Sequence, residues 1–127
     1  MAKILIADDE PQVREMLEET LEELVDQGVE LIIAGNGMEA LEAIRQYRPE
    51  LVFLDVLMPK MNGIEVCEAT KNQLGLRDVQ IIMLISEGQD YENQRLREVG
   101  ADSFIMKPLD PDQVYEMAAA VLGLSGA

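Results

Sequence analysis

The stretch LVFLDVLMPKMNG, residues Leu51–Gly63, begins with four apolar residues and brings that run to an end at the carboxylate of Asp55. A short, unbroken apolar run is typical of a strand that is buried on both faces of a sheet. Other runs of strand length occur along the chain at Lys3–Ala7, Glu30–Ala34, Gln80–Ile85 and Ser103–Met106. The sequence therefore predicts five strands, the third of which is Leu51–Asp55.

Segments with apolar residues at helical spacing separate these strands. Helices are expected over Val13–Leu24, Leu41–Tyr47, Asn62–Leu74, Tyr91–Val99 and Val114–Leu122. Asn36 and Asn62 suit helix N-caps, Pro11 suits a first helical turn, and Gly100 is placed to end a helix. Alternating strands and helices with right-handed crossovers indicate an α/β domain with a parallel sheet covered on both faces. The domain is expected to span residues 1–122, with 123–127 as a flexible tail.

Composition narrows the function further. The 127 residues contain 10 Lys plus Arg against 25 Asp plus Glu, which gives a net charge of −15. Such a field repels nucleic acids and anionic lipid, so neither is an expected direct partner. No apolar stretch is long enough to span a membrane, and the single Cys67 cannot form an internal disulfide, so a cytoplasmic setting is expected. Histidine is absent, which excludes imidazole as a base, a zinc ligand or a phosphoryl carrier.

Charged residues follow three of the predicted strands. Asp8 and Asp9 come after the first strand, Asp55 ends the third, and Lys107 follows the fifth. In parallel sheets ligands bind outside the carboxyl ends of the strands. Crowded carboxylates repel one another, but a hard divalent cation such as Mg²⁺ and a nearby ammonium would make them tolerable. The same groups suit phosphoryl transfer with a carboxylate as the nucleophile.

Four segments carry a family resemblance: ILIADDEP (Ile4–Pro11), LVFLDVLMPKMNG (Leu51–Gly63), IIML (Ile81–Leu84) and GADSFIMKP (Gly100–Pro108). With them, nearly the whole chain, about residues 2–122, resembles the receiver domains of two-component response regulators, especially the single-domain type found in chemotaxis. The resemblance implies a flavodoxin-like fold whose five-stranded parallel sheet has the order 2-1-3-4-5. That order would bring the ends of the first and third strands together.

The resemblance also assigns roles to individual residues. It implies that Asp55 accepts a phosphoryl group from a histidine kinase or a phosphotransfer protein. Asp8 and Asp9 would bind Mg²⁺ together with Asp55 and the backbone carbonyl of Leu57, and Lys107 would contact the phosphoryl group. The protein would promote its own phosphorylation and a slow dephosphorylation without being a conventional enzyme. A downstream protein or an output domain would read the switched surface, expected at about Tyr91–Leu122.

One position departs from the family pattern. Receiver domains carry Thr or Ser at the end of the fourth strand, where this chain has Ile85, followed by Ser86. Isoleucine has no hydroxyl to donate to a phosphoryl oxygen. Either Ser86 takes over through a one-residue shift of the loop, or the coupling to the switch aromatic, Phe104 by resemblance, is weakened. The second reading leaves a rival function, a pseudo-receiver that acts as an interaction module without phosphorylation.

Overall fold

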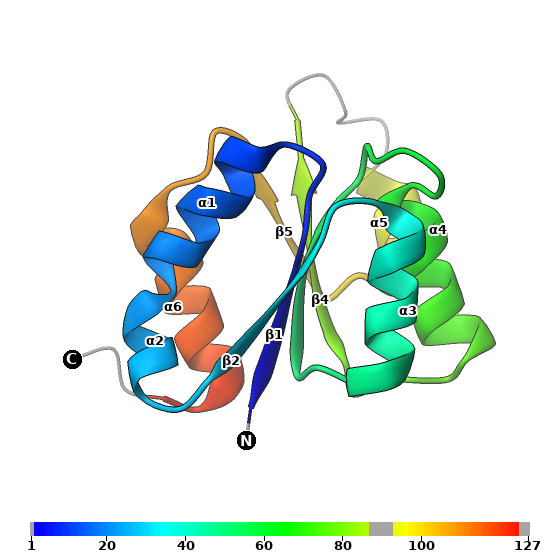
Figure 1. Ribbon diagram of the computed structural model, residues 1–127. Helices are drawn as coiled ribbons and strands as arrows, with labels where there is room; N and C mark the ends of the chain where they lie inside the picture. The colour runs from blue at the N-terminus through cyan, green and yellow to red at the C-terminus, as the bar shows by residue number, and fades with distance from the viewer. Residues whose placement is uncertain (1, 87–92, 125–127) are drawn as a thin grey trace.

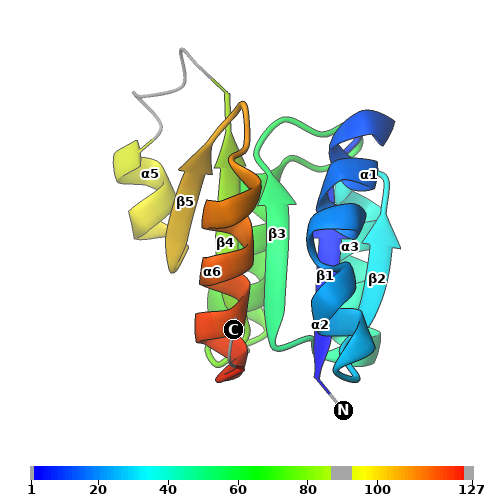
Figure 2. The ribbon, with the colours of Figure 1, turned by 90° about the vertical axis from the view of Figure 1, so that its left-hand side faces the viewer.

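In the part of the chain that the computed structural model describes, residues 2–86 and 93–124, five parallel strands form one sheet in the order β2-β1-β3-β4-β5. The fold class expected from the sequence is therefore confirmed. The strand bounds also agree with the prediction: β1 (Lys3–Ala7), β2 (Glu30–Ala34), β3 (Leu51–Asp55), β4 (Gln80–Ile85) and β5 (Ser103–Met106). All five strands run in the same direction, so their carboxyl ends meet at one edge of the sheet (Figure 2).

Helices cover both faces of the sheet (Figure 1). The first face carries α1 (Pro11–Thr20), α2 (Glu22–Asp26) and α6 (Pro111–Leu122). The second face carries α3 (Gly37–Tyr47), α4 (Gly63–Glu68), the π-helix η1 (Ala69–Gln73) and α5 (Asn93–Glu98). Within the described residues, every helix is too short or too polar to cross a lipid bilayer.

The central strands are buried between two apolar layers, because their side chains alternate between the faces of the sheet. On one face, Ile6 and Phe53 belong to a core cluster with Leu17 of α1 and Val114 of α6. On the other face, a second cluster joins strand residues to the helices α3 and α4 and includes Leu54, Met83, Ile44 and Val66. This two-sided burial accounts for the nearly continuous apolar runs in the sequence.

Two predicted helices are interrupted in the structure. The first breaks at Leu21, where α1 ends and α2 begins. The helix expected over Asn62–Leu74 continues as a π-helix, in which the Leu74 N–H donates to the carbonyl of Ala69 at 2.8 Å. At this point the Thr70 hydroxyl also donates to the carbonyl of Val66 at 2.8 Å, a side-chain bond that competes with helical pairing.

Several sequence expectations fall partly outside the described residues. The first two positions of the helix expected over Tyr91–Val99 lie there, and so do the last three of the predicted tail. Gly123 and Leu124 donate hydrogen bonds to carbonyls of α6, and Gly123 has a φ of 69° that suits its place after the helix. The flexibility of the tail stays a prediction. The N-caps Asn36 and Asn62 and the helix start at Pro11 are confirmed.

Candidate functional site

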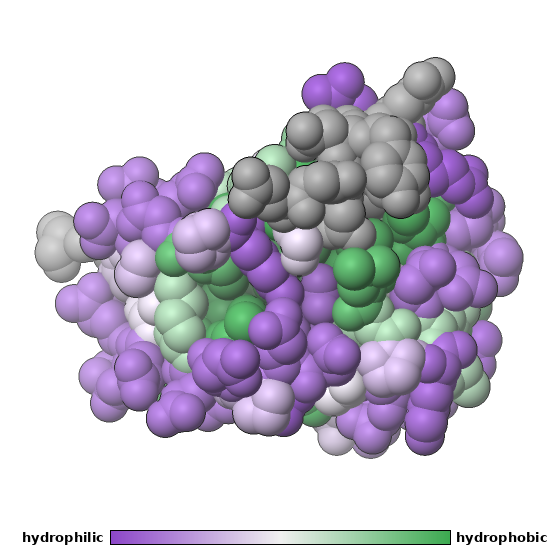
Figure 3. Space-filling view, turned by 90° about the horizontal axis from the view of Figure 1, so that it is seen from above, coloured by the Kyte–Doolittle hydropathy of each residue, from purple (hydrophilic) through white to green (hydrophobic). Residues whose placement is uncertain are grey.

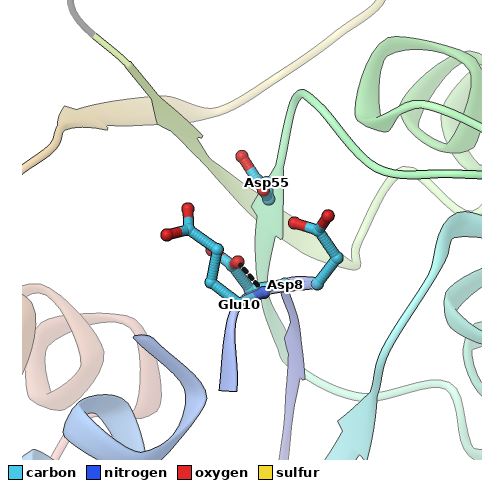
Figure 4. Close-up of side chains that lie close together, drawn as sticks. Asp8, Glu10 and Asp55 are labelled. Atoms are coloured by element: carbon cyan, nitrogen blue, oxygen red, sulfur yellow. Dashed lines mark hydrogen bonds between the residues drawn. The ribbon is translucent and has the colours of Figure 1, made fainter. Parts of the chain in front are cut away.

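Four carboxylates gather at the carboxyl ends of β1 and β3. Residues Ala7 and Leu54 are paired across these neighbouring strands, so the next residues, Asp8 and Asp55, lie at the same edge. Asp8, Asp9, Glu10 and Asp55 each offer one oxygen, and these oxygens lie within 4.8 Å of one another. Figure 4 shows Asp8 and Glu10 on the segment after β1, with Asp55 at the end of β3.

This edge of the sheet is seen from above in Figure 3, where hydrophilic side chains lie across the face between hydrophobic patches. Asp8 and Asp55 are nearly inaccessible, with exposed fractions of 0% and 2%. Asp9 and Glu10 are exposed. The cluster therefore has two buried carboxylates at its base and two exposed carboxylates at its rim.

Lys107 brings a positive charge into contact with these carboxylates. It directly follows β5, and its backbone N–H donates to the carbonyl of Ile85 at 2.7 Å. Its Nζ lies 3.0 Å from Asp8 Oδ2, 3.1 Å from Glu10 Oε1 and 3.5 Å from Asp55 Oδ1. One ammonium group thus links the ends of β1, β3 and β5. The Lys107 side chain is 12% exposed.

Burial changes the acidity of these groups. The pKa of Asp55 is raised from 3.8 to about 7, chiefly because burial removes its contact with water and also because the charge of Asp8 lies nearby. The Lys107 charge and the Leu57 N–H, which donates to Asp55 Oδ1 at 3.4 Å, act in the opposite direction. Burial alone would lower the pKa of Lys107, but its contacts with Asp8, Asp55 and Glu10 raise the pKa above its usual value.

The donor set fits a hard divalent cation. Asp8 Oδ2 is buried and accepts no hydrogen bond of good geometry from the described residues, although the Lys107 ammonium forms an ion pair with it. A buried anionic oxygen without a full set of partners is costly, and a cation would relieve that cost. Carboxylate oxygens are the ligands that Mg²⁺ prefers. Asp8, Asp9 and Asp55, predicted from the sequence, could hold the ion, and their assignment as ligands stays a prediction.

Local structure fixes the strand end that carries Asp55 against the start of α4. Asn62 caps α4 with a reciprocal pair of bonds, accepting from the Glu65 N–H at 2.9 Å while Glu65 accepts from the Asn62 N–H at 3.0 Å. Gly63 then brings the start of α4 against the end of β3. A Cβ added at Gly63 would lie 2.2 Å from the backbone oxygen of Asp55, so only glycine permits this approach.

The switch positions are placed as follows. Ile85 is the last residue of β4 and is 2% exposed in the apolar core, so no hydroxyl stands at that position. Ser86 follows it and is half-buried. Phe104 lies in β5 and packs against the core cluster that contains Ile85, with the Arg97 guanidinium 5.5 Å from its ring centre. The roles of Ser86, Phe104 and the Leu57 carbonyl stay predictions.

Glu10 is the site residue that the sequence interpretation missed. Its carboxylate contacts Lys107 and lies with the three aspartates. A signal was present, because Glu10 extends the acidic pair Asp8–Asp9 into a run of three directly before Pro11. The sequence pattern could not show that its side chain turns toward the strand ends, because that depends on the backbone between β1 and α1.

Comparisons with known proteins agree with this geometry. Residues 4–119 match the family model described as the response regulator receiver domain. The chain is 40% identical over 120 residues to a probable transcriptional regulator, ycf27, of Pyropia yezoensis, a match that covers 94% of this chain and 47% of that protein. It is 37% identical to the DNA-binding response regulator MtrA of Mycolicibacterium smegmatis, covering 94% and 50%.

Solved structures give the same result. The chemotaxis response regulator CheY4 of Vibrio cholerae superimposes with a TM-score of 0.82 at 33% identity, covering 95% of this chain and 98% of that chain. A putative response regulator from Chloroflexus aurantiacus gives 0.84 at 30% identity, covering 96% and 98%. The chain belongs to the response regulator receiver domain family. It spans about half the length of the curated relatives it matches.

Proposed function

We propose that the chain is a phosphoacceptor switch of a two-component phosphorelay, with Asp55 as the residue that is phosphorylated. The observation that carries the proposal is the buried Asp55 carboxylate, 3.5 Å from the Lys107 ammonium and within 4.8 Å of three further acids. A structural ion pair needs one carboxylate for one ammonium. Four acids around a single lysine leave an excess of negative charge that favours a bound cation, and that cation with Lys107 could in turn hold an anionic phosphoryl group.

In the proposed reaction an Asp55 carboxylate oxygen attacks the phosphorus of a phosphohistidine on a histidine kinase or a phosphotransfer protein. The P–N bond breaks, a P–O bond forms, and the electron pair leaves with the imidazole of the donor. Asp55 must be ionised for this attack, and positive charge beside it favours that form. Hydrolysis of the acyl phosphate in the same pocket would return the protein slowly to its starting state.

The chain's own residues would orient the incoming group. Asp8 and Asp9, with Asp55, would hold Mg²⁺, which when bound supplies positive charge to the phosphoryl oxygens. The Lys107 ammonium would contact a further phosphoryl oxygen. The Leu57 N–H, which already donates to Asp55 Oδ1, is a second donor near the place where negative charge accumulates.

The output surface proposed for the switch is formed by α5, β5 and α6. Apolar side chains are exposed there, at Met106 of β5 and Val121 of α6. Phe104, also in β5, is partly buried and packs against the core cluster that contains Ile85, which supports a coupling role for it. A change at the end of β4 would reach that surface through the packing of Phe104. A downstream protein, or an output domain in a longer chain, would read it.

Intact-mass measurement with Mg²⁺ and a small acyl-phosphate donor tests the proposal. The protein should gain the mass of one phosphoryl group, and Asp55→Asn should abolish the gain. Asp78→Asn, which changes an exposed acid outside the site, is the matched control and should be phosphorylated normally. The pseudo-receiver is the rival function, favoured by Ile85, and it predicts no mass gain with any donor.

A further inference from the structure

Glu10 contacts the lysine of the site from the rim of the pocket. Its Oε1 accepts a hydrogen bond from Lys107 Nζ at 3.1 Å, and its side chain is 47% exposed. Asp8, the other close partner of Lys107, is buried with 0% exposure. The ammonium is therefore shared between an acid that is fixed in the interior and an acid that borders solvent.

The backbone of Glu10 is fixed, whereas its side chain is held by a single contact among those described. The Glu10 N–H donates to Asp8 Oδ1 at 2.9 Å, and its carbonyl accepts from Val13 and Arg14 at the start of α1. Among residues 2–86 and 93–124, the contact of the Glu10 carboxylate is the one with Lys107. Glu10 can therefore release the ammonium by a side-chain rotation, with no change in the strand or the helix.

The distances rank the three acids around Lys107. Its Nζ is nearer to Asp8 and Glu10, at 3.0 and 3.1 Å, than to Asp55, at 3.5 Å. A phosphoryl group on Asp55 would bring additional anionic oxygens close to the ammonium. Because one ammonium has three protons to donate, new bonds to those oxygens compete with the existing ones. Because Glu10 is the exposed partner, its contact with Lys107 can break before that of the buried Asp8.

We propose that Glu10 is a positioning residue that holds the Lys107 ammonium in the unphosphorylated state and competes with the phosphoryl group for it. This inference rests on the proposed function, since it assumes that Asp55 carries the phosphoryl group. Loss of the Glu10 contact should leave Lys107 more available and so strengthen binding of a phosphoryl group. A partly exposed ion pair of this kind corresponds to a change of about two- to fivefold in affinity.

The experiment is a titration with beryllofluoride, an anion that mimics a phosphoryl group on a carboxylate, at saturating Mg²⁺. Amide ¹H–¹⁵N signals would report the midpoint. Glu10→Gln should bind about two- to fivefold more tightly than the wild type. Glu10→Asp keeps the charge but is one methylene shorter, so it should lose the contact and behave like Glu10→Gln. Glu15→Gln, which removes an exposed charge on α1, should bind like the wild type.

A double-mutant cycle tests whether Glu10 acts through Lys107. In a Lys107→Met background, Glu10→Gln should no longer change the midpoint. The inference is overturned if the effect persists in that background, or if Glu10→Asp behaves like the wild type, because Glu10 would then act on the anion through its charge alone. Equal binding by wild type and Glu10→Gln also overturns it and leaves the proposed function standing. A wild type that binds no beryllofluoride overturns both.

Discussion

Lys107 reaches across the strand ends to bring its Nζ within 3.5 Å of Asp55 Oδ1, although Asp55 ends β3 and Lys107 follows β5, and these strands are not neighbours in the sheet. β4 separates β3 from β5, and the lysine side chain bridges over its end. A change in the charge of Asp55 is therefore felt directly at β5. The Asp55–Lys107 contact thus links the candidate site to the end of β5, which belongs to the proposed output surface.

The acidity of Asp55 predicts a pH-dependent effect on stability. The pKa of Asp55 is about 7 in the folded protein, whereas a pKa of 3.8 is expected for the same carboxyl in the unfolded chain. Between these values the folded state binds more protons, so the contribution of Asp55 to the free energy of unfolding falls as the pH rises. As the pH rises from about 5 to about 8, the free energy of unfolding of Asp55→Asn should therefore increase relative to that of the wild type. The expected increase is on the order of 2 kcal/mol.

Urea unfolding of both proteins in metal-free buffer at the two pH values measures this difference. Asp78→Asn controls for the loss of one carboxylate in a position away from the site. If the free-energy difference between Asp55→Asn and the wild type is the same at both pH values, the raised pKa of Asp55 is wrong.

Mg²⁺ should stabilise the folded protein. At a Mg²⁺ concentration tenfold above the dissociation constant, the expected gain is about 1.4 kcal/mol. Asp8→Asn removes the charge of a buried carboxylate of the candidate site, so the Mg²⁺-induced gain should be largely lost. Thermal unfolding with and without Mg²⁺ measures it. Asp26→Asn, at the end of α2, should retain the full gain, and the same gain in Asp8→Asn would contradict the proposal that Asp8 is a ligand.

Gly63→Ala should be strongly destabilising. Its new Cβ would lie 2.2 Å from the Asp55 carbonyl oxygen, so α4 must move away from the end of β3. The expected loss is about 2 kcal/mol or more in the free energy of unfolding. Gly35→Ala is the matched control, because its Cβ would meet no atom closer than 3.7 Å. Equal unfolding midpoints for the two variants in urea would show that this approach is not tight.

The strands were predictable from the sequence because their apolar runs report burial on both faces. The strand order came from the family resemblance, because no residue pattern within one strand identifies its neighbours. The breaks at Leu21 and at η1 were not predictable, since helical periodicity continues across both. Lys71 illustrates how contacts that are distant in the sequence shape such a segment. It is buried in η1, where its Nζ lies 2.8 Å from Asp102 Oδ2, a partner 31 residues away that no local pattern indicates.

The site residues that were predictable are charged residues at or directly after the end of a strand. Asp8, Asp55 and Lys107 are of this kind. Their proximity follows from the sheet once its order is known. Glu10 could not be assigned in this way, because it lies two residues beyond Asp8 and its direction is set by the turn into α1. The departure at Ile85 was visible in the sequence, and the structure adds that its side chain fills the core rather than the pocket.

Ser86 is expected to transmit phosphorylation to Phe104. Ser86→Ala should leave the mass gain at Asp55 intact and reduce the phosphorylation-dependent shifts of backbone amide signals around Phe104 by at least half. Those shifts are measured by ¹H–¹⁵N correlation spectra before and after phosphorylation. Thr20→Ala removes a hydroxyl from α1 as a control. Unchanged shifts in Ser86→Ala would mean that Ser86 does not replace the hydroxyl missing at Ile85.

The central claim concerns one carboxylate, and peptide mass spectrometry of the phosphorylated protein tests it most directly. After reaction with Mg²⁺ and an acyl-phosphate donor, borohydride reduction converts an aspartyl phosphate to homoserine and so marks the modified residue permanently. The proposed function predicts that the mark is found at Asp55 and at neither Asp8 nor Asp9. A mark at another residue, or an unmodified Asp55 under conditions that saturate Mg²⁺, would contradict it.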